Sequence, residues 1–79
     1  MTAVLQSLEQ LWATTVPTQV PAREQWVLWL GMHDEGTLRY AVNETAMKAF
    51  RMGGRMSQDH AIRYASKCMN SRTRNSAQR

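Results

Sequence analysis

Apolar residues recur at helical spacing in four segments of this chain, and no segment shows the sustained alternation that is typical of a strand. The first segment places its apolar residues at i, i+4 and i+7 after Thr2, a residue suited to cap a helix. This pattern predicts a helix over residues 3–13. The sequence therefore predicts an all-α fold, a small bundle of three to four helices.

Two prolines shape the next part of the chain. Residues 14–20 contain three threonines and Pro17, and they predict a semi-rigid connector that ends the first helix. Pro21 is suited to the first position of a second helix, because the N–H that it lacks would be unpaired there. That helix is expected to run to about Gly31 or Met32.

Capping residues define the last two helices. Asp34 is a suitable N-cap for a third helix from Glu35 to Met52, with a Glu44 to Lys48 pair at i, i+4 on its outer face. Gly53 and Gly54 can end that helix, so the third and fourth helices should form a hairpin. Ser57 caps the fourth helix, and residues 71–79 have no apolar anchor and are expected to fray as a basic tail.

The length of 79 residues fits a single domain over residues 1–79. A core of this size contributes only about 3–5 kcal/mol, so self-association, such as a homodimer, stays open. Trp26 and Trp29 lie on one helical face, which favours packing in the core over stacking on bases. The expected core consists of Trp12, Trp26, Trp29, Val42, Phe50 and Ile62.

Charge is distributed unevenly along the chain. Residues 1–46 carry two basic and five acidic residues, whereas residues 47–79 carry eight basic residues and one acidic residue. The halves have net charges of −3 and +7, within an overall +4. A cationic half of this kind favours an anionic partner, either nucleic acid or an acidic protein surface. The residues expected to contact that partner are Arg51, Arg55, Arg63, Lys67, Arg72 and Arg74.

The sequence lacks a catalytic or metal-binding set. Asp34 and Glu35 are needed at a helix start, and no nucleophile accompanies His33. His60 and Cys68 stand about 12 Å apart on a helix, too far for one metal ion. We therefore expect no enzyme, no metal and no cofactor.

The single cysteine, Cys68, permits no internal disulfide and is typical of a reducing compartment, so the sequence predicts a cytoplasmic protein. The N-terminal segment does not resemble a signal peptide, because no basic residue precedes its apolar positions. The longest apolar stretch, WVLWLGM, is too short to span a membrane.

Two resemblances bear on function. The third and fourth helices resemble a helix-turn-helix with Gly53 in the turn, although Lys48 and Asp59 then occupy positions where apolar residues belong. QWVLWL, HDEGTLRYAV and AIRYASKCMN resemble the C-terminal helical module of DnaD-type replication proteins, over about residues 24–70. That resemblance implies a nucleic-acid-associated role in replication. It assigns no binding residue, because Ile62, Tyr64 and Met69 depart from the aromatic spacing of that family.

These observations predict a small non-enzymatic DNA-associated accessory or regulatory protein whose basic half contacts the phosphate backbone. The alternative is a protein-binding inhibitor or adaptor, for example a mobile-element protein that blocks a host defence complex. In that case the same basic surface would meet an acidic partner, and Met47 and Met52 could add adaptable apolar contacts. A solvated basic face with a disordered tail and no partner also stays open. Membrane-surface binding comes third, because the fourth helix keeps only a narrow apolar face once it is packed.

Overall fold

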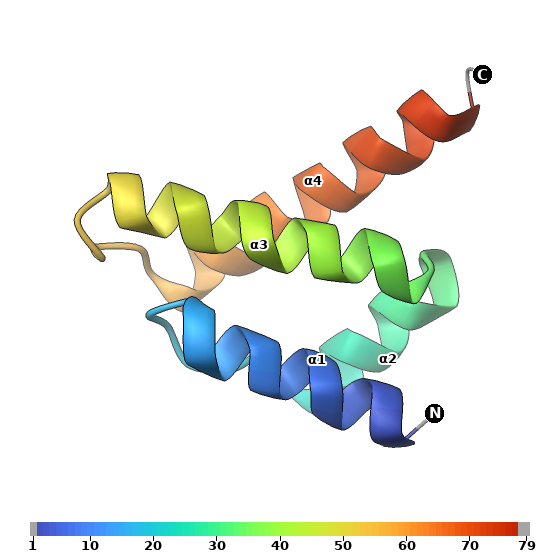
Figure 1. Cartoon of the computed structure of the whole chain (residues 1–79), viewed down its shortest axis with the longest axis horizontal. Coiled ribbons are helices and arrows are strands. Elements are labelled where there is room, and N and C mark those ends of the chain that lie inside the picture. The colour runs from blue at the N-terminus through green and yellow to red at the C-terminus, as the bar shows by residue number, and fades with distance from the viewer. Residues whose placement is uncertain (1, 78–79) are drawn as a thin grey trace.

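The computed structural model describes the backbone of residues 2–77 and the side chains of residues 3–73. Within residues 2–77 the chain forms four helices and no strand: α1 (Thr2–Thr15), α2 (Arg23–Met32), α3 (Glu35–Arg51) and α4 (Gln58–Ala77). Helices α1 and α3 lie side by side, α4 packs behind α3, and the short α2 closes one end (Figure 1). The all-α fold and the hairpin of the third and fourth helices are confirmed.

Helix α1 is longer than the sequence pattern predicts, because its last two threonines continue the helix. The Thr14 and Thr15 hydroxyls donate to carbonyl oxygens one turn earlier, including a 2.6 Å bond from Thr15 to Leu11. The connector therefore covers residues 16–22, and α2 starts at Arg23, after Pro21. The Trp12 indole N–H donates to the Thr18 hydroxyl at 3.1 Å and holds the connector against the bundle.

Three tryptophans form the centre of the core. Trp26 makes edge-to-face contacts with Trp12 and with Trp29, at ring-centroid distances of 5.8 and 5.2 Å. Such contacts stabilise the fold beyond the contribution that comes from burying each ring. These residues and Val42 are buried as expected, and Ile62 is half-buried against them.

The prediction that Phe50 belongs to the core is wrong: its side chain is 85% exposed. Helix α3 turns Val42, Thr45 and Ala49 toward the core. Each residue is rotated by about 100° from the one before it, so the residue after Ala49 points outward. Buried Thr45 satisfies its hydroxyl within the helix by donating to the Ala41 carbonyl at 2.7 Å.

The predicted end of α3 at the glycine pair is confirmed. The Gly54 N–H donates to the Ala49 carbonyl at 2.8 Å, and the Gly53 N–H donates to the Phe50 carbonyl at 3.0 Å. This is the Schellman arrangement, which needs a left-handed residue after the helix. Both glycines are left-handed, with φ of 69° and 77°.

Helix starts also follow the capping residues. The Asp34 carboxylate accepts a 2.7 Å hydrogen bond from the Thr37 N–H at the start of α3. The Ser57 hydroxyl accepts a 3.1 Å bond from the His60 N–H at the start of α4.

Helix α4 continues to Ala77, beyond residue 71, where the sequence predicts a frayed tail. Polar contacts secure this extension. Arg72 donates to the Gly36 carbonyl at 3.3 Å, and the Thr73 hydroxyl lies 2.9 Å from His33 Nδ1. The rest of the predicted tail, residues 78–79, lies outside the described residues.

Candidate functional site

Ion pairing differs between the two halves of the chain. Both cations of the N-terminal half are paired, Arg23 with Glu9 at 3.0 Å and Arg39 with Glu35 at 2.8 Å. In the C-terminal half, within residues 47–73, only Arg63 has a carboxylate partner, Asp59 at 3.2 Å. The other described cations of this half have no ion pair: Lys48, Arg51, Arg55, Lys67 and Arg72.

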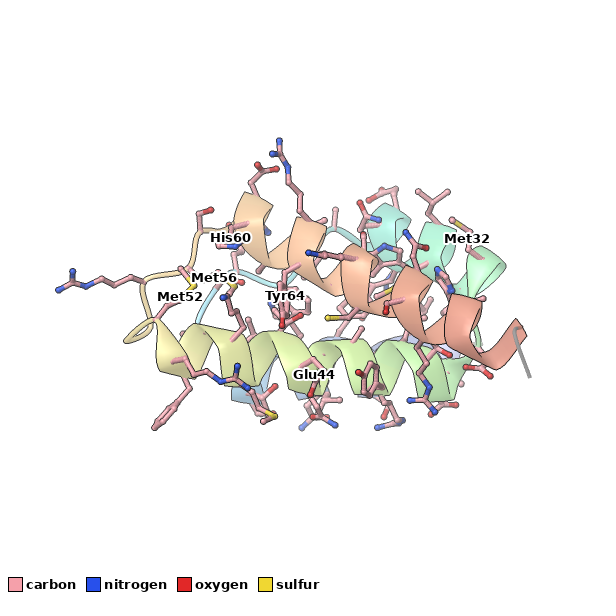
Figure 2. All side chains as sticks on the ribbon, turned by 90° about the horizontal axis from the view of Figure 1, so that it is seen from above. Met32, Glu44, Met52, Met56, His60 and Tyr64 are labelled. Atoms are coloured by element: carbon pink, nitrogen blue, oxygen red, sulfur yellow. The ribbon has the colours of Figure 1, made fainter. Side chains whose placement is uncertain are left out.

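Two of these cations lie over aromatic rings of the neighbouring helix, where α3 and α4 pack together. The Lys48 ammonium is 6.0 Å from the centroid of the Tyr64 ring, and the Arg72 guanidinium is 4.9 Å from that of Tyr40. The partners in each pair are equally distant in sequence from Met56, so α3 and α4 run antiparallel along their length. Figure 2 shows Tyr64 reaching from α4 toward α3.

This packing differs from a helix-turn-helix, in which the two helices cross at about 90–120°. It also explains why the predicted Glu44 to Lys48 ion pair is not found, since Lys48 lies over Tyr64 instead. Lys48 was missing from the predicted contact residues. Only the register of the hairpin places Lys48 beside Tyr64 of α4, and sequence spacing does not give that register.

The predicted contact residues fall into separate groups. Arg51 is the last residue of α3, and Arg55 is exposed in the following loop. Arg63 and Lys67 lie one turn apart on the outer face of α4, where both line an open pocket of about 590 Å³. Arg72 turns toward α3 and does not share that face. The side chain of Arg74 lies outside the described residues.

The chemistry of Cys68 and Tyr64 on α4 does not favour a nucleophile. Burial raises the pKa of the Cys68 thiol, although the hydrogen bond from Tyr64 lowers it in part. Burial also raises the pKa of the Tyr64 hydroxyl. Both groups are therefore neutral near pH 7. Among the described residues, no three His, Cys, Asp or Glu side chains come together as metal ligands would.

Some apolar side chains remain on the surface. On α2, Val27, Leu28 and Met32 are at least half exposed, and Met32 is at the end of the bundle away from the α3–α4 loop (Figure 2). On α3, Met47 and Phe50 are exposed. None of the helices within residues 2–77 has both the length and the apolar composition that crossing a bilayer requires.

Comparison with known proteins gives no match. No family model matches the chain, and no similar curated protein or solved structure is found. The resemblance to the DnaD-type helical module therefore stays a prediction.

Proposed function

We propose that this chain is a small non-enzymatic nucleic-acid-associated accessory protein whose α3–α4 hairpin contacts the phosphate backbone of DNA. One observation carries the proposal: Arg51, Arg55 and Lys67 are unpaired and exposed, whereas both cations of the N-terminal half are neutralised. Cations without carboxylate partners attract polyanions, and phosphate contacts release condensed counterions from DNA.

The hairpin offers two groups of phosphate contacts. Arg51 and Arg55 are at its loop end, and Arg63 and Lys67 are on the outer face of α4. The ion pair of Arg63 with Asp59 is highly exposed, at 79% and 73%. Exposed pairs contribute only about 0–1 kcal/mol, so Arg63 can exchange Asp59 for a phosphate at little cost. The guanidinium groups are suited to this role because their donors match phosphate oxygens in pairs.

The first test is a titration of the protein into labelled single-stranded and duplex oligonucleotides at about 50 and 200 mM salt. The informative variant is Arg55→Gln/Lys67→Gln, and its control, Arg23→Gln/Arg39→Gln, removes the same charge from the other half. We expect affinity to fall steeply with salt, and the slope against salt to decrease by about one per lost contact only in the first variant. Failure to bind at the lower salt would overturn the proposal, as would equal losses in both variants.

The alternative adaptor function is supported by a different feature. Met47 is half exposed on the same helix as Lys48 and Arg51. A flexible apolar side chain beside cations suits an acidic protein partner, as an inhibitor from a mobile element would need. In that case the chain would copurify with one protein and ignore DNA. As for location, a single cysteine without a disulfide is typical of a reducing compartment, which supports the cytoplasm.

A further inference from the structure

A second surface lies where α1 and α3 end. A pocket of about 430 Å³ opens there between the end of α1, the connector and the glycine pair. No carboxylate lines it, and only one of its lining residues has a polar side chain. The lining residues are Thr15, Pro17, Ala46, Phe50, Gly53 and Gly54.

Phe50 is the most exposed large apolar side chain among residues 3–73. Its backbone is fixed, because its carbonyl accepts the Gly53 N–H in the Schellman turn. The surface next to it is bare, since a Cβ atom added to Gly53 or Gly54 would meet no atom within 4 Å. An aromatic ring at the rigid end of α3 therefore lies beside the exposed backbone of the two glycines.

Two cations that lie close to this pocket in the chain, without lining it, indicate the kind of ligand. Arg51 follows Phe50 directly, Arg55 follows the glycine pair, and neither has an ion pair within the described residues. The Thr15 hydroxyl already donates to Leu11. The pocket thus offers an aromatic face and no acidic group, and two exposed cations stand next to its lining residues in the chain. A flat aromatic ligand with an attached anion fits this combination.

We propose that Phe50 is a stacking platform for an unpaired nucleobase, with Arg51 and Arg55 binding the adjoining phosphates. This inference rests on the proposed nucleic-acid function and adds a preference to it. Bases in a duplex are stacked on each other and cannot reach a side chain on the protein surface without being extruded. The hairpin should therefore bind single-stranded nucleic acid more tightly than duplex, without strong dependence on base sequence.

The test compares a single strand of about 12 nucleotides, which covers one typical binding site, with the matching duplex and with an abasic strand of equal charge. Phe50→Ala should weaken single-strand binding by about tenfold, because stacking on an aromatic side chain contributes about that much per base. Binding of the duplex and of the abasic strand should stay unchanged. The control Met47→Ala truncates another exposed apolar residue of α3 and should change none of the three.

The variant Phe50→Trp gives a direct readout. The native tryptophans are buried, so the introduced indole would be the exposed one, and a stacked base should quench its fluorescence. Phe50→Trp should also bind the single strand at least as tightly as the unmodified protein does, in contrast to Phe50→Ala.

The outcomes separate this inference from the proposed function. If Phe50→Ala leaves single-strand binding intact while Arg55→Gln/Lys67→Gln weakens it, the stacking inference fails and the phosphate-binding function stands. Equal losses on all three nucleic acids would also overturn stacking. If the unmodified protein binds none of them at low salt but binds a peptide of glutamates and phenylalanines, both proposals fail and the surface is a protein-binding site.

Discussion

Trp29 donates its indole N–H to the Ser66 hydroxyl at 3.0 Å, a bond that joins the short helix α2 to α4. The three core tryptophans differ in this respect. Trp12 has Thr18 as a partner, whereas the Trp26 N–H is buried with none. A buried donor without a partner is destabilising, so the Trp29 N–H depends on Ser66 as its acceptor.

Ser66→Ala should therefore lower the free energy of unfolding by about 1–3 kcal/mol, since the Trp29 N–H would lose its acceptor. Urea unfolding followed by tryptophan fluorescence measures this. The control Ser71→Ala changes an exposed serine of the same helix and should stay within about 0.5 kcal/mol of the unmodified protein. Equal effects of the two substitutions would show that the hydrogen bond contributes nothing.

Glycines in helices and glycines after a helix should respond oppositely to alanine. Gly53→Ala should be destabilising by about 1–2 kcal/mol, because its φ of 69° is strained for any residue with a Cβ atom. Gly31→Ala should be stabilising by up to about 1 kcal/mol, because Gly31 lies within α2 and has open space around it. Thermal unfolding midpoints should shift in opposite directions. A shift of the same sign in both would contradict the role of the left-handed turn.

Asp34 should make stability depend on pH in the acid range. The hydrogen bonds from Thr37 lower the pKa of this carboxyl below its ordinary value of 3.8. A group whose pKa is lower in the folded state contributes stability above its ordinary pKa, and that contribution is lost as pH falls through the lowered value. Asp34→Asn keeps a cap acceptor but cannot titrate. The stability difference between the two proteins should shrink from about pH 6 to about pH 2, and a constant difference would contradict this assignment.

Cys68 should react slowly with alkylating reagents in the folded protein. Burial raises the pKa of its thiol, and only the thiolate is nucleophilic. The rate of iodoacetamide labelling near pH 8 should therefore be lower than that of a free thiol, and unfolding in urea should restore it. Labelling at the same rate in the folded and unfolded protein would show that Cys68 is not protected.

Local chemistry explains what the sequence predicts well. The starts of α3 and α4 depend on Asp34 and Ser57, and the end of α3 depends on two glycines. Each of these involves residues within one turn of each other. Sequence patterns therefore identify the helices, the hairpin and the buried tryptophans.

Contacts between distant residues explain what the sequence misses. Phe50 fits a helical apolar stripe, but packing selects Ala49 as the inward residue. Lys48 meets Tyr64 only through the register of the hairpin. The predicted binding residues do not share one surface, because Arg72 contacts Gly36 and Tyr40 on another helix.

The contacts of Arg72 should hold the C-terminal part of α4 in place. Its guanidinium lies 4.9 Å from the Tyr40 ring centroid and donates to the Gly36 carbonyl. Arg72→Ala removes both contacts, each worth about 0.5–1 kcal/mol at an exposed site. Backbone amides of residues 71–73 should then exchange with solvent about fivefold faster, while amides near the buried Ala61 should exchange as before.

The control Arg63→Ala removes a cation from the outer face of α4, where its ion pair is exposed. It should leave the exchange rates of residues 71–73 unchanged. Equal exchange in Arg72→Ala and the unmodified protein would mean that α4 does not need this anchor, and Arg72 would then be free to join the phosphate contacts.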